Sequence, residues 1–109
     1  MVDIYCNIVG AKKIIINYDQ KLNLDINYLI RSITRTISLI IIANPNSPTG
    51  TVIKKEIFLK ILKKAKSYKV PVIIDEAYYG FYKFSYIKYI KKFNNLIIIR
   101  TFSKAFGLA

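Results

Sequence analysis

Three polar segments carry the residue types that could do chemistry, and each of them follows an apolar run. They are residues 44–50 (Asn-Pro-Asn-Ser-Pro-Thr-Gly), 75–78 (Asp-Glu-Ala-Tyr) and 101–104 (Thr-Phe-Ser-Lys). An unprotonated lysine amine such as that of Lys104 can condense with an aldehyde. The carboxylate of Asp75, at the end of an apolar run, is costly without a positive partner. Loop hydroxyls and backbone N–H groups can receive a phosphate.

The composition excludes several other kinds of site. The sequence contains no histidine, which rules out imidazole metal sites and Ser-His or Cys-His nucleophiles, and we expect no metal. Cys6 is the only cysteine, so no disulfide can form within the chain. Catalysis must therefore use other groups, of which a lysine and a carboxylate are the candidates.

The elements that must position these segments alternate between strand and helix. Apolar runs predict buried strands at 37–43, 70–74 and 96–99, and the nearly continuous run at 37–43 is typical of a strand covered on both faces. Helical spacing predicts a helix at 54–68 and a short one at 85–92. Such alternation is typical of the α/β class, with a mainly parallel sheet and helices on both faces.

The first part of the chain predicts two helices and one strand. Residues 2–9 suggest a short helix closed by Gly10, and the β-branched run 13–17 suggests a strand. Asp25 is a plausible N-cap for a second helix. The apolar stripe of that helix consists of Ile26, Leu29, Ile30 and Ile33.

A parallel sheet brings the polar segments together, because the carboxyl ends of its strands share one edge. The residues that follow Ala43, Ile74 and Ile99 should emerge there, with Asp75 and Lys104 on the same side. Ligands of such sheets bind outside the carboxyl ends of the strands. We therefore predict one site at this edge.

The three segments, in this order, resemble those of the class I/II aminotransferases, which are pyridoxal 5'-phosphate (PLP) enzymes of fold type I. Residues 100–104 and 75–78 look most like the histidinol-phosphate aminotransferase branch. The resemblance runs through nearly all of the chain but covers only part of a full-length member. It implies that residues 1–109 are part of the PLP-binding large domain, without the N-terminal segment and the C-terminal small domain. We do not expect such a fragment to turn over substrate alone.

The resemblance also assigns roles to individual residues. Lys104 would hold the cofactor and then act as the base at the substrate Cα, and Asp75 would pair with the pyridinium nitrogen. Tyr78 matches the family tyrosine that hydrogen-bonds the phenolic oxygen of the cofactor. Thr101 and Ser103 lie in the stretch that binds the PLP phosphate in the family.

The segment 44–50 departs from the family pattern, which usually has asparagine directly before Pro-Thr-Gly. Here that position is Ser47. Either Ser47 donates a weaker hydrogen bond to the phenolic oxygen, or Asn46 reaches it from one position earlier, and Asn46 is slightly favoured. The Ser47–Pro48 bond is a candidate for the cis form, because only X-Pro bonds adopt it at modest cost.

The formal charge of +12 raises the possibility of a nucleic acid or membrane partner. The lysines are spread along the chain, however, as a base composition rich in A and T would produce, and we expect neither partner. No secretory signal and no apolar run near the roughly 18 residues of a membrane span occurs, which favours the cytoplasm. The resemblance implies an amino donor and a 2-oxo acid as substrates, and homodimers for full-length members.

Two other functions remain open at this stage. One is a different PLP reaction on the same scaffold, such as decarboxylation of a phosphorylated amino acid, since the missing domain selects the Cα bond that is broken. The other is a non-catalytic basic fragment that binds nucleic acid or an acidic partner.

Overall fold

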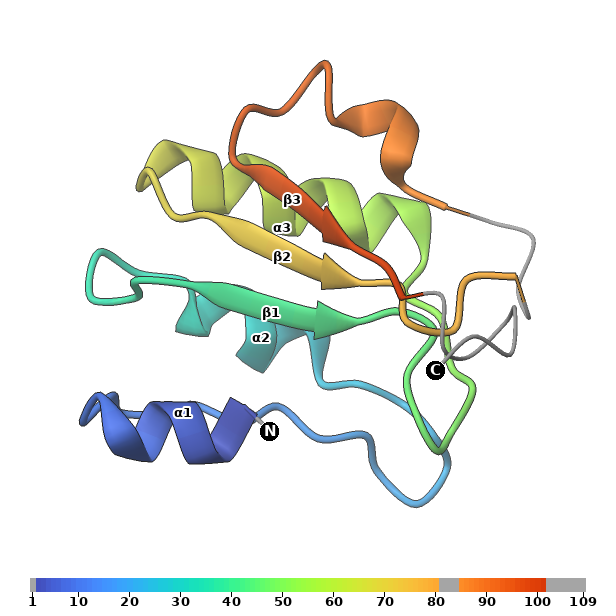
Figure 1. Cartoon of the computed structure of the whole chain (residues 1–109), viewed down its shortest axis with the longest axis horizontal. Helices are drawn as coiled ribbons and strands as arrows, with labels where there is room; N and C mark the ends of the chain where they lie inside the picture. Colours follow the sequence, from blue (N-terminus) through green and yellow to red (C-terminus); the bar gives the residue numbers. More distant parts are fainter. Residues whose placement is uncertain (1, 81–84, 102–109) are drawn as a thin grey trace. The chain divides into compact units, whose positions relative to one another are not determined.

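The computed structural model describes residues 2–80 and 85–101, and it divides into two compact units. Unit 1 comprises Met1–Ser32 and unit 2 comprises Ile33–Ala109. Figure 1 labels the elements in chain order: α1 (Val2–Ile8), α2 (Ile26–Ser32), β1 (Ile40–Ala43), α3 (Lys55–Ser67), β2 (Val72–Asp75), the 3-10 helix η1 (Ile87–Tyr89) and β3 (Leu96–Ile99).

Unit 1 contains the two helices that the sequence predicts. After α1 the chain turns at Gly10, whose φ of +67° lies in the left-handed region that glycine favours, and the N–H of Ala11 donates to the carbonyl of Cys6 at 2.8 Å. At the start of α2, Oδ1 of Asp25 accepts a hydrogen bond from the N–H of Tyr28 at 2.9 Å. Asp25 is therefore the N-cap that the sequence predicts.

The strand expected at 13–17 was wrong. Residues 11–17 form no strand, and the β-type pairing described in unit 1 is an isolated antiparallel bridge between Tyr18 and Leu24. A β-branched run becomes a strand only when a second strand accepts its backbone hydrogen bonds, and no described segment does so here.

Unit 2 is built on a parallel sheet with the strand order β1-β2-β3 (Figure 1). The register aligns Ala43 with Asp75 and Asp75 with Ile99. All three strands therefore end at one edge, as the sequence predicts. The connection from β1 to β2 contains α3, and that from β2 to β3 contains η1.

Helix α3 packs on one face of this sheet and forms the core with it. The side chains of Val72 and Ile74 on that face are fully buried, and Leu96 is nearly so. The helix contributes buried residues at the predicted spacing, namely Phe58, Ile61, Leu62 and Ala65. The α/β class and the parallel sheet with helices are thus confirmed.

The opposite face of the sheet is much more open. Ile41, Ile97 and Ile99 point to this side and are 44%, 47% and 48% exposed. The expectation that the strand at 37–43 is covered on both faces therefore does not hold for β1 in the described structure. β1 is also shorter than predicted, since it begins at Ile40 rather than at Ile37.

The segment predicted as a short helix at 85–92 forms only the single 3-10 turn η1 in the described structure. Tyr89, the last residue of η1, is buried, and the buried Tyr86 is the residue directly before η1. The ring of Tyr86 stacks on Phe58 of α3 with 3.7 Å between centroids. Packing of these aromatic rings, rather than helix propensity, therefore determines the path of this segment.

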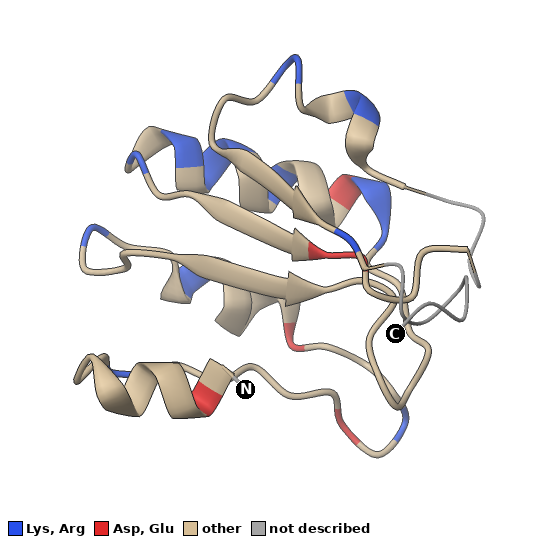
Figure 2. Cartoon of the chain, viewed as in Figure 1, with Lys and Arg blue, Asp and Glu red and all other residues tan. Residues whose placement is uncertain are grey.

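Figure 2 shows several basic positions along α3 and in the segments around it. The exposed lysines of α3 are on the side of the helix away from the sheet, as the sequence predicts for a solvated face; they are Lys55, Lys60, Lys63 and Lys66. Across the described residues, no helix has the length and apolar character needed to span a membrane.

Candidate active site

The three polar segments leave the sheet next to one another at the carboxyl edge of unit 2 (Figure 1). The N–H of Asn44 donates to the carbonyl of Asp75 at 3.0 Å, and the N–H of Glu76 donates to the carbonyl of Ile99 at 2.8 Å. The first residues beyond the strands are thus held by the same ladder that holds the strands themselves. The segments after β1, β2 and β3 therefore begin at one edge of the sheet, as the sequence predicts.

Asp75 is the last residue of β2 and lies on the face opposite α3. Its side chain is half-buried, and Oδ1 accepts a hydrogen bond from the N–H of Ala77 at 2.9 Å. Among the described residues, Ala77 is the one donor to this carboxylate. The second oxygen, Oδ2, can therefore accept a bond from a cationic group or an N–H of a ligand.

The loop that follows β1 is a compact turn closed by Asn46. The peptide bonds Asn44–Pro45 and Ser47–Pro48 are both cis, and the second of these was predicted. Nδ2 of the Asn46 side chain donates to Oγ1 of Thr49 at 2.8 Å. The backbone carbonyl of Asn46 accepts a hydrogen bond from the N–H of Gly50 at 2.7 Å. Gly50 has a φ of +69°, a conformation that favours glycine. The side chain of Asn46 is therefore used inside the turn.

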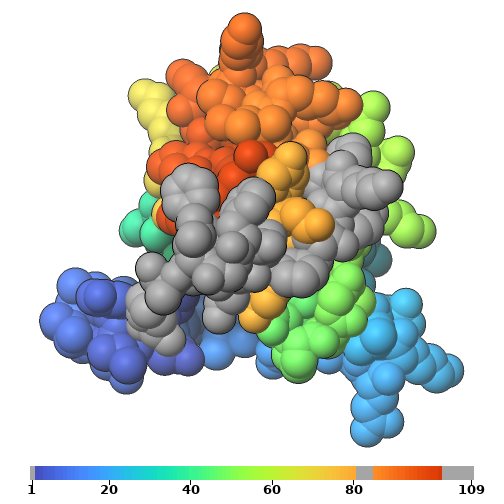
Figure 3. Space-filling model, turned by 45° about the vertical axis from the view of Figure 1, so that its right-hand side comes forward, coloured from blue at the N-terminus to red at the C-terminus, as the bar shows by residue number. Residues whose placement is uncertain are grey.

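Ser47 connects this loop to the turn that follows β2. Its Oγ donates to the hydroxyl of Tyr78 at 3.5 Å, the long end of the hydrogen-bond range. Ser47 is exposed, whereas Tyr78 is half-buried. The space-filling view shows atoms of the two segments on the same face of unit 2, the loop in green and the turn in orange-yellow (Figure 3).

Asn44 fixes the base of the loop. It is 2% exposed, and its Oδ1 accepts a hydrogen bond from the N–H of Ile53 at 2.8 Å. The hydroxyl of Tyr86 donates to the carbonyl of the same Ile53. Both backbone groups of Ile53 are thereby satisfied, so the start and the return of the loop are held together.

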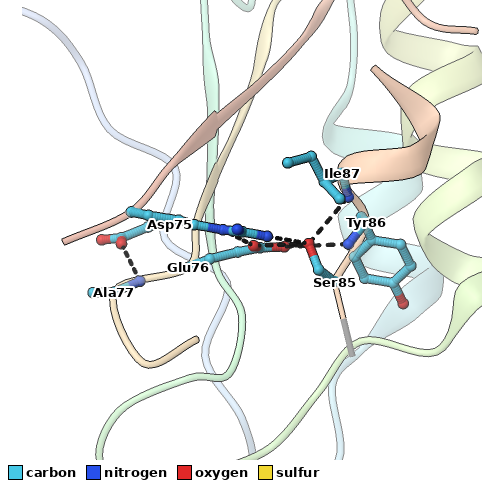
Figure 4. Close-up of polar contacts among 7 residues, drawn as sticks. Asp75, Glu76, Ala77, Ser85, Tyr86 and Ile87 are labelled. Atoms are coloured by element: carbon cyan, nitrogen blue, oxygen red, sulfur yellow. Dashed lines mark hydrogen bonds and ion pairs between the residues drawn. The ribbon is translucent and has the colours of Figure 1, made fainter. Parts of the chain in front are cut away.

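Glu76 and Arg100 form an ion pair that the sequence interpretation left without a role. Nε of Arg100 donates to Oε2 of Glu76 at 2.9 Å, and the carboxylate is buried (Figure 4). A signal for this pair existed in the sequence. In a parallel sheet the residue after Asp75 lies beside the residue after Ile99, and these residues carry opposite charges.

Some of the predicted site residues lie at the same sheet edge, and others lie outside the described residues. Asp75, Tyr78 and Ser47 belong to adjoining segments at the sheet edge, while Thr101 follows β3 and is half-buried. Ser103 and Lys104 lie outside the described residues.

The described groups fit PLP chemically. One carboxylate oxygen of Asp75 can accept a hydrogen bond from a protonated ring nitrogen. The hydroxyls of Ser47 and Tyr78 can donate hydrogen bonds to an anionic oxygen. Both kinds of group follow strands that end at the same edge.

Comparisons with known proteins identify the family of the chain. The family model for aminotransferases of class I and II matches residues 1–109. The histidinol-phosphate aminotransferase of Caldanaerobacter subterraneus subsp. tengcongensis is 40% identical over 110 residues, which cover 100% of this chain and 30% of that protein. The corresponding enzyme of Thermotoga neapolitana is 54% identical over 71 residues, which cover 65% of this chain and 20% of that protein.

Solved structures show the same fold. The crystal structure of the histidinol-phosphate aminotransferase from Clostridium acetobutylicum matches with a TM-score of 0.83 at 32% identity, over 94% of this chain and 31% of that chain. A PLP-bound C-S lyase from Staphylococcus hominis, complexed with the inhibitor L-cycloserine, matches with a TM-score of 0.75 at 25% identity, over 97% of this chain and 29% of that chain. The chain spans less than a third of the length of these relatives. With the family model matching its whole length, the chain belongs to the class I and II aminotransferase family.

Proposed function

We propose that the protein containing this chain transfers an amino group between an amino donor and a 2-oxo acid, with PLP as its cofactor. The proposal is carried by the meeting of Asp75, Ser47 and Tyr78 at one sheet edge, in a chain that matches the aminotransferase family throughout. PLP is supported by the family and by the PLP-bound neighbour. When bound, PLP supplies an electron sink for the pair released at the substrate Cα.

Lys104 is the proposed anchor for PLP and the base at the substrate Cα. Its amine must be unprotonated to attack an aldehyde, so its pKa in the assembled site must lie below that of an ordinary lysine. Lys104 follows Arg100 by four residues, and Arg100 directly follows β3. Its segment therefore begins at the edge where Asp75 lies.

Asp75 is proposed to hold the ring nitrogen in its protonated form. The backbone N–H of Ala77 already orients the carboxylate through Oδ1, so little rotation remains when a ligand binds. A carboxylate at the end of an apolar strand gains most from a cationic partner, because the surroundings screen the charges poorly.

Ser47, rather than Asn46, is the proposed partner of the phenolic oxygen. The amide of Asn46 donates to Thr49 within the turn, whereas the hydroxyl of Ser47 reaches that of Tyr78. An oxygen placed beside Ser47 and Tyr78 could accept a hydrogen bond from both. Thr101 and Ser103 are the proposed phosphate ligands, together with backbone N–H groups.

The relatives suggest the amino donor. Proteins named histidinol-phosphate aminotransferase match at 40% identity along the whole chain, so we propose histidinol phosphate as the donor to test first. We also propose that the full-length protein is a homodimer in the cytoplasm. The C-S lyase neighbour has the same fold but a different named activity, so a lyase or decarboxylase is the second candidate.

The decisive experiment uses a full-length chimaera in which residues 1–109 replace the matching segment of the Caldanaerobacter enzyme. Lys104→Ala should abolish the visible absorbance of the linkage between PLP and lysine, the borohydride-reducible linkage itself and amino transfer to 2-oxoglutarate. Lys60→Ala, which changes an exposed lysine of α3, is the matched control and should behave as wild type. A linkage that moves to another lysine with activity intact would contradict the assignment of Lys104.

The role of Asp75 is tested in the same chimaera. Asp75→Asn should keep the reducible linkage but slow removal of the Cα proton by several orders of magnitude, each factor of ten corresponding to about 1.4 kcal/mol of barrier. Exchange of the Cα proton with deuterium in the solvent measures this step directly. Release of sulfide or carbon dioxide instead of amino transfer would favour the second candidate.

A further inference from the structure

Glu76 is a buried carboxylate beside the candidate active site, and within the described part of the chain its side chain makes no hydrogen bond to a group proposed to bind PLP. Its side chain is 1% exposed, yet both oxygens are fully engaged. Oε2 accepts from Nε of Arg100 at 2.9 Å and from Oγ of Ser85 at 2.9 Å, and Oε1 accepts from the N–H of Tyr86 at 3.2 Å (Figure 4). The hydroxyl of Ser85 is also 2.8 Å from Oε1.

Arg100 is held as firmly as the carboxylate that it neutralises. Its second guanidinium nitrogen donates to Oγ of Ser85 at 2.9 Å. The guanidinium carbon lies 3.7 Å from the centroid of the Tyr79 ring. Glu76, Ser85, Tyr79 and Arg100 therefore form one connected cluster. A buried charge that loses its partner is strongly unfavourable, so this cluster should have one stable arrangement.

The cluster is joined to the turn that carries Asp75 and Tyr78. Successive residues of a strand point to opposite faces, so Asp75 turns to the open face while Glu76 turns toward the core. The N–H of Glu76 donates to the carbonyl of Ile99 at 2.8 Å, and its carbonyl accepts the N–H of Tyr79 at 2.9 Å. Anchoring of Glu76 thus fixes the backbone on both sides of it.

The cluster also reaches the other two polar segments. Arg100 immediately precedes Thr101, at the start of the segment that contains Lys104. Tyr86, whose N–H binds Glu76, donates its hydroxyl to the carbonyl of Ile53, where the loop after β1 returns to the core. All three segments of the candidate active site are therefore connected to one buried carboxylate.

We propose that Glu76 is a positioning residue that holds the turn carrying Asp75 and Tyr78 in fixed register with the segment leading to Lys104. This inference rests on the proposed function. Glu76 acts through Arg100 and the backbone, on the side of the sheet opposite to the carboxylate of Asp75. A misplacement of about 1 Å at a reacting centre can cost about 100-fold in rate, so loss of this anchor should lower turnover while leaving cofactor binding intact.

The test compares Glu76→Gln and Arg100→Lys in the full-length chimaera loaded with PLP. Glu76→Gln keeps the size of the side chain but removes its negative charge. Arg100→Lys keeps the positive charge but removes the planar guanidinium group, which donates in two directions. We expect kcat at saturating amino donor to fall by about 10-fold to 100-fold in Glu76→Gln and by a smaller factor in Arg100→Lys. KM, the PLP content and the linkage to Lys104 should stay near wild type.

Asp3→Asn, which removes the exposed ion pair with Lys13, is the control and should leave kcat unchanged. Because Arg100→Lys keeps the buried carboxylate neutralised, it provides a folded variant if Glu76→Gln does not fold. Wild-type kcat in either folded variant would overturn the positioning role of Glu76. The proposed function would survive that result, because it fails only if the wild-type chimaera lacks amino transfer or the PLP linkage at Lys104.

Discussion

The two units of the chain use apolar residues in opposite ways. In unit 2, Phe58, Ile61 and Leu62 are fully buried between α3 and the sheet. In unit 1, neither helix has a buried residue, and Ile4 and Ile8 are 62% and 72% exposed. The same residue types therefore stabilise one unit and contribute little to the other, because burial depends on what faces them. We expect unit 2 to carry nearly all of the stability of the isolated chain.

The largest effect that tests this comparison should come from the core of unit 2. Phe58→Ala removes a fully buried ring that stacks on Tyr86, and it should lower the free energy of unfolding by about 3 to 5 kcal/mol. Urea unfolding followed by circular dichroism measures this change. Ile8→Ala in unit 1 is the control, with an expected change of less than about 0.5 kcal/mol. Similar losses in both variants would show that unit 1 has a core of its own.

A smaller effect should come from the bond between Tyr86 and Ile53. Tyr86→Phe keeps the stacked ring but leaves the buried carbonyl of Ile53 without that donor, at a cost of about 1 to 3 kcal/mol. The measurement is again the urea midpoint. Tyr5→Phe, at a tyrosine that is 62% exposed, should leave the midpoint where it is. An unchanged midpoint in Tyr86→Phe would mean that the hydroxyl bond adds nothing to the core.

In unit 1 the expected effects are local. Asp25→Ala removes the N-cap of α2 and should cost that helix about 1 kcal/mol. Faster hydrogen exchange of the α2 amides, with no change in α3 or β2, would confirm that the unit responds separately. Asp25→Ser can still cap the helix and should keep exchange near wild type. Faster exchange throughout unit 2 after Asp25→Ala would contradict the separation.

The smallest effect concerns the exposed ion pair of unit 1. The hydrogen bond from Lys13, and then its charge, hold the pKa of the Asp3 carboxyl below its ordinary value. A lowered folded-state pKa gives a stabilisation that is present above the unfolded pKa and is lost as the pH falls through the folded value. Because both groups are exposed to solvent, we expect no measurable change in the urea midpoint when the pH is lowered through the folded-state pKa of Asp3.

An NMR titration tests the same pair directly. Lys13→Met should raise the pKa of Asp3 toward its ordinary value, whereas Lys12→Met, at a lysine next to it in sequence, should not. A pKa of Asp3 that does not respond to Lys13→Met would show that the contact is not populated in solution.

Much of unit 2 could be predicted from sequence because its patterns reflect local rules. The runs before Asp75 and Arg100 became β2 and β3. Of the apolar residues predicted for one face of α3, all but the half-buried Ile57 are buried. The run at 13–17 looked equally suited to a strand, yet it has no strand partner among the described residues. Strand formation depends on a partner elsewhere in the chain, which a local pattern does not contain.

The candidate active site shows the same division. The prediction of a parallel sheet was sufficient to place the ends of its strands at one edge and Asp75 near the loop after β1. The hydrogen bond from Asn46 to Thr49, which leaves Ser47 beside Tyr78, depends on how the turn folds on itself. The ion pair of Glu76 and Arg100 joins residues far apart in sequence, and only the strand register brings them together.

The open face of the sheet in unit 2 has a consequence for handling the chain at high concentration. Ile41, Ile97 and Ile99 present an apolar surface that favours association, while the net charge of +12 keeps copies apart. Added salt shortens the range of that repulsion from about 30 Å at 0.01 M to about 3 Å at 1 M, and it leaves the apolar attraction in place. Clear solutions should therefore be obtained at low ionic strength, and turbidity should appear as salt is added.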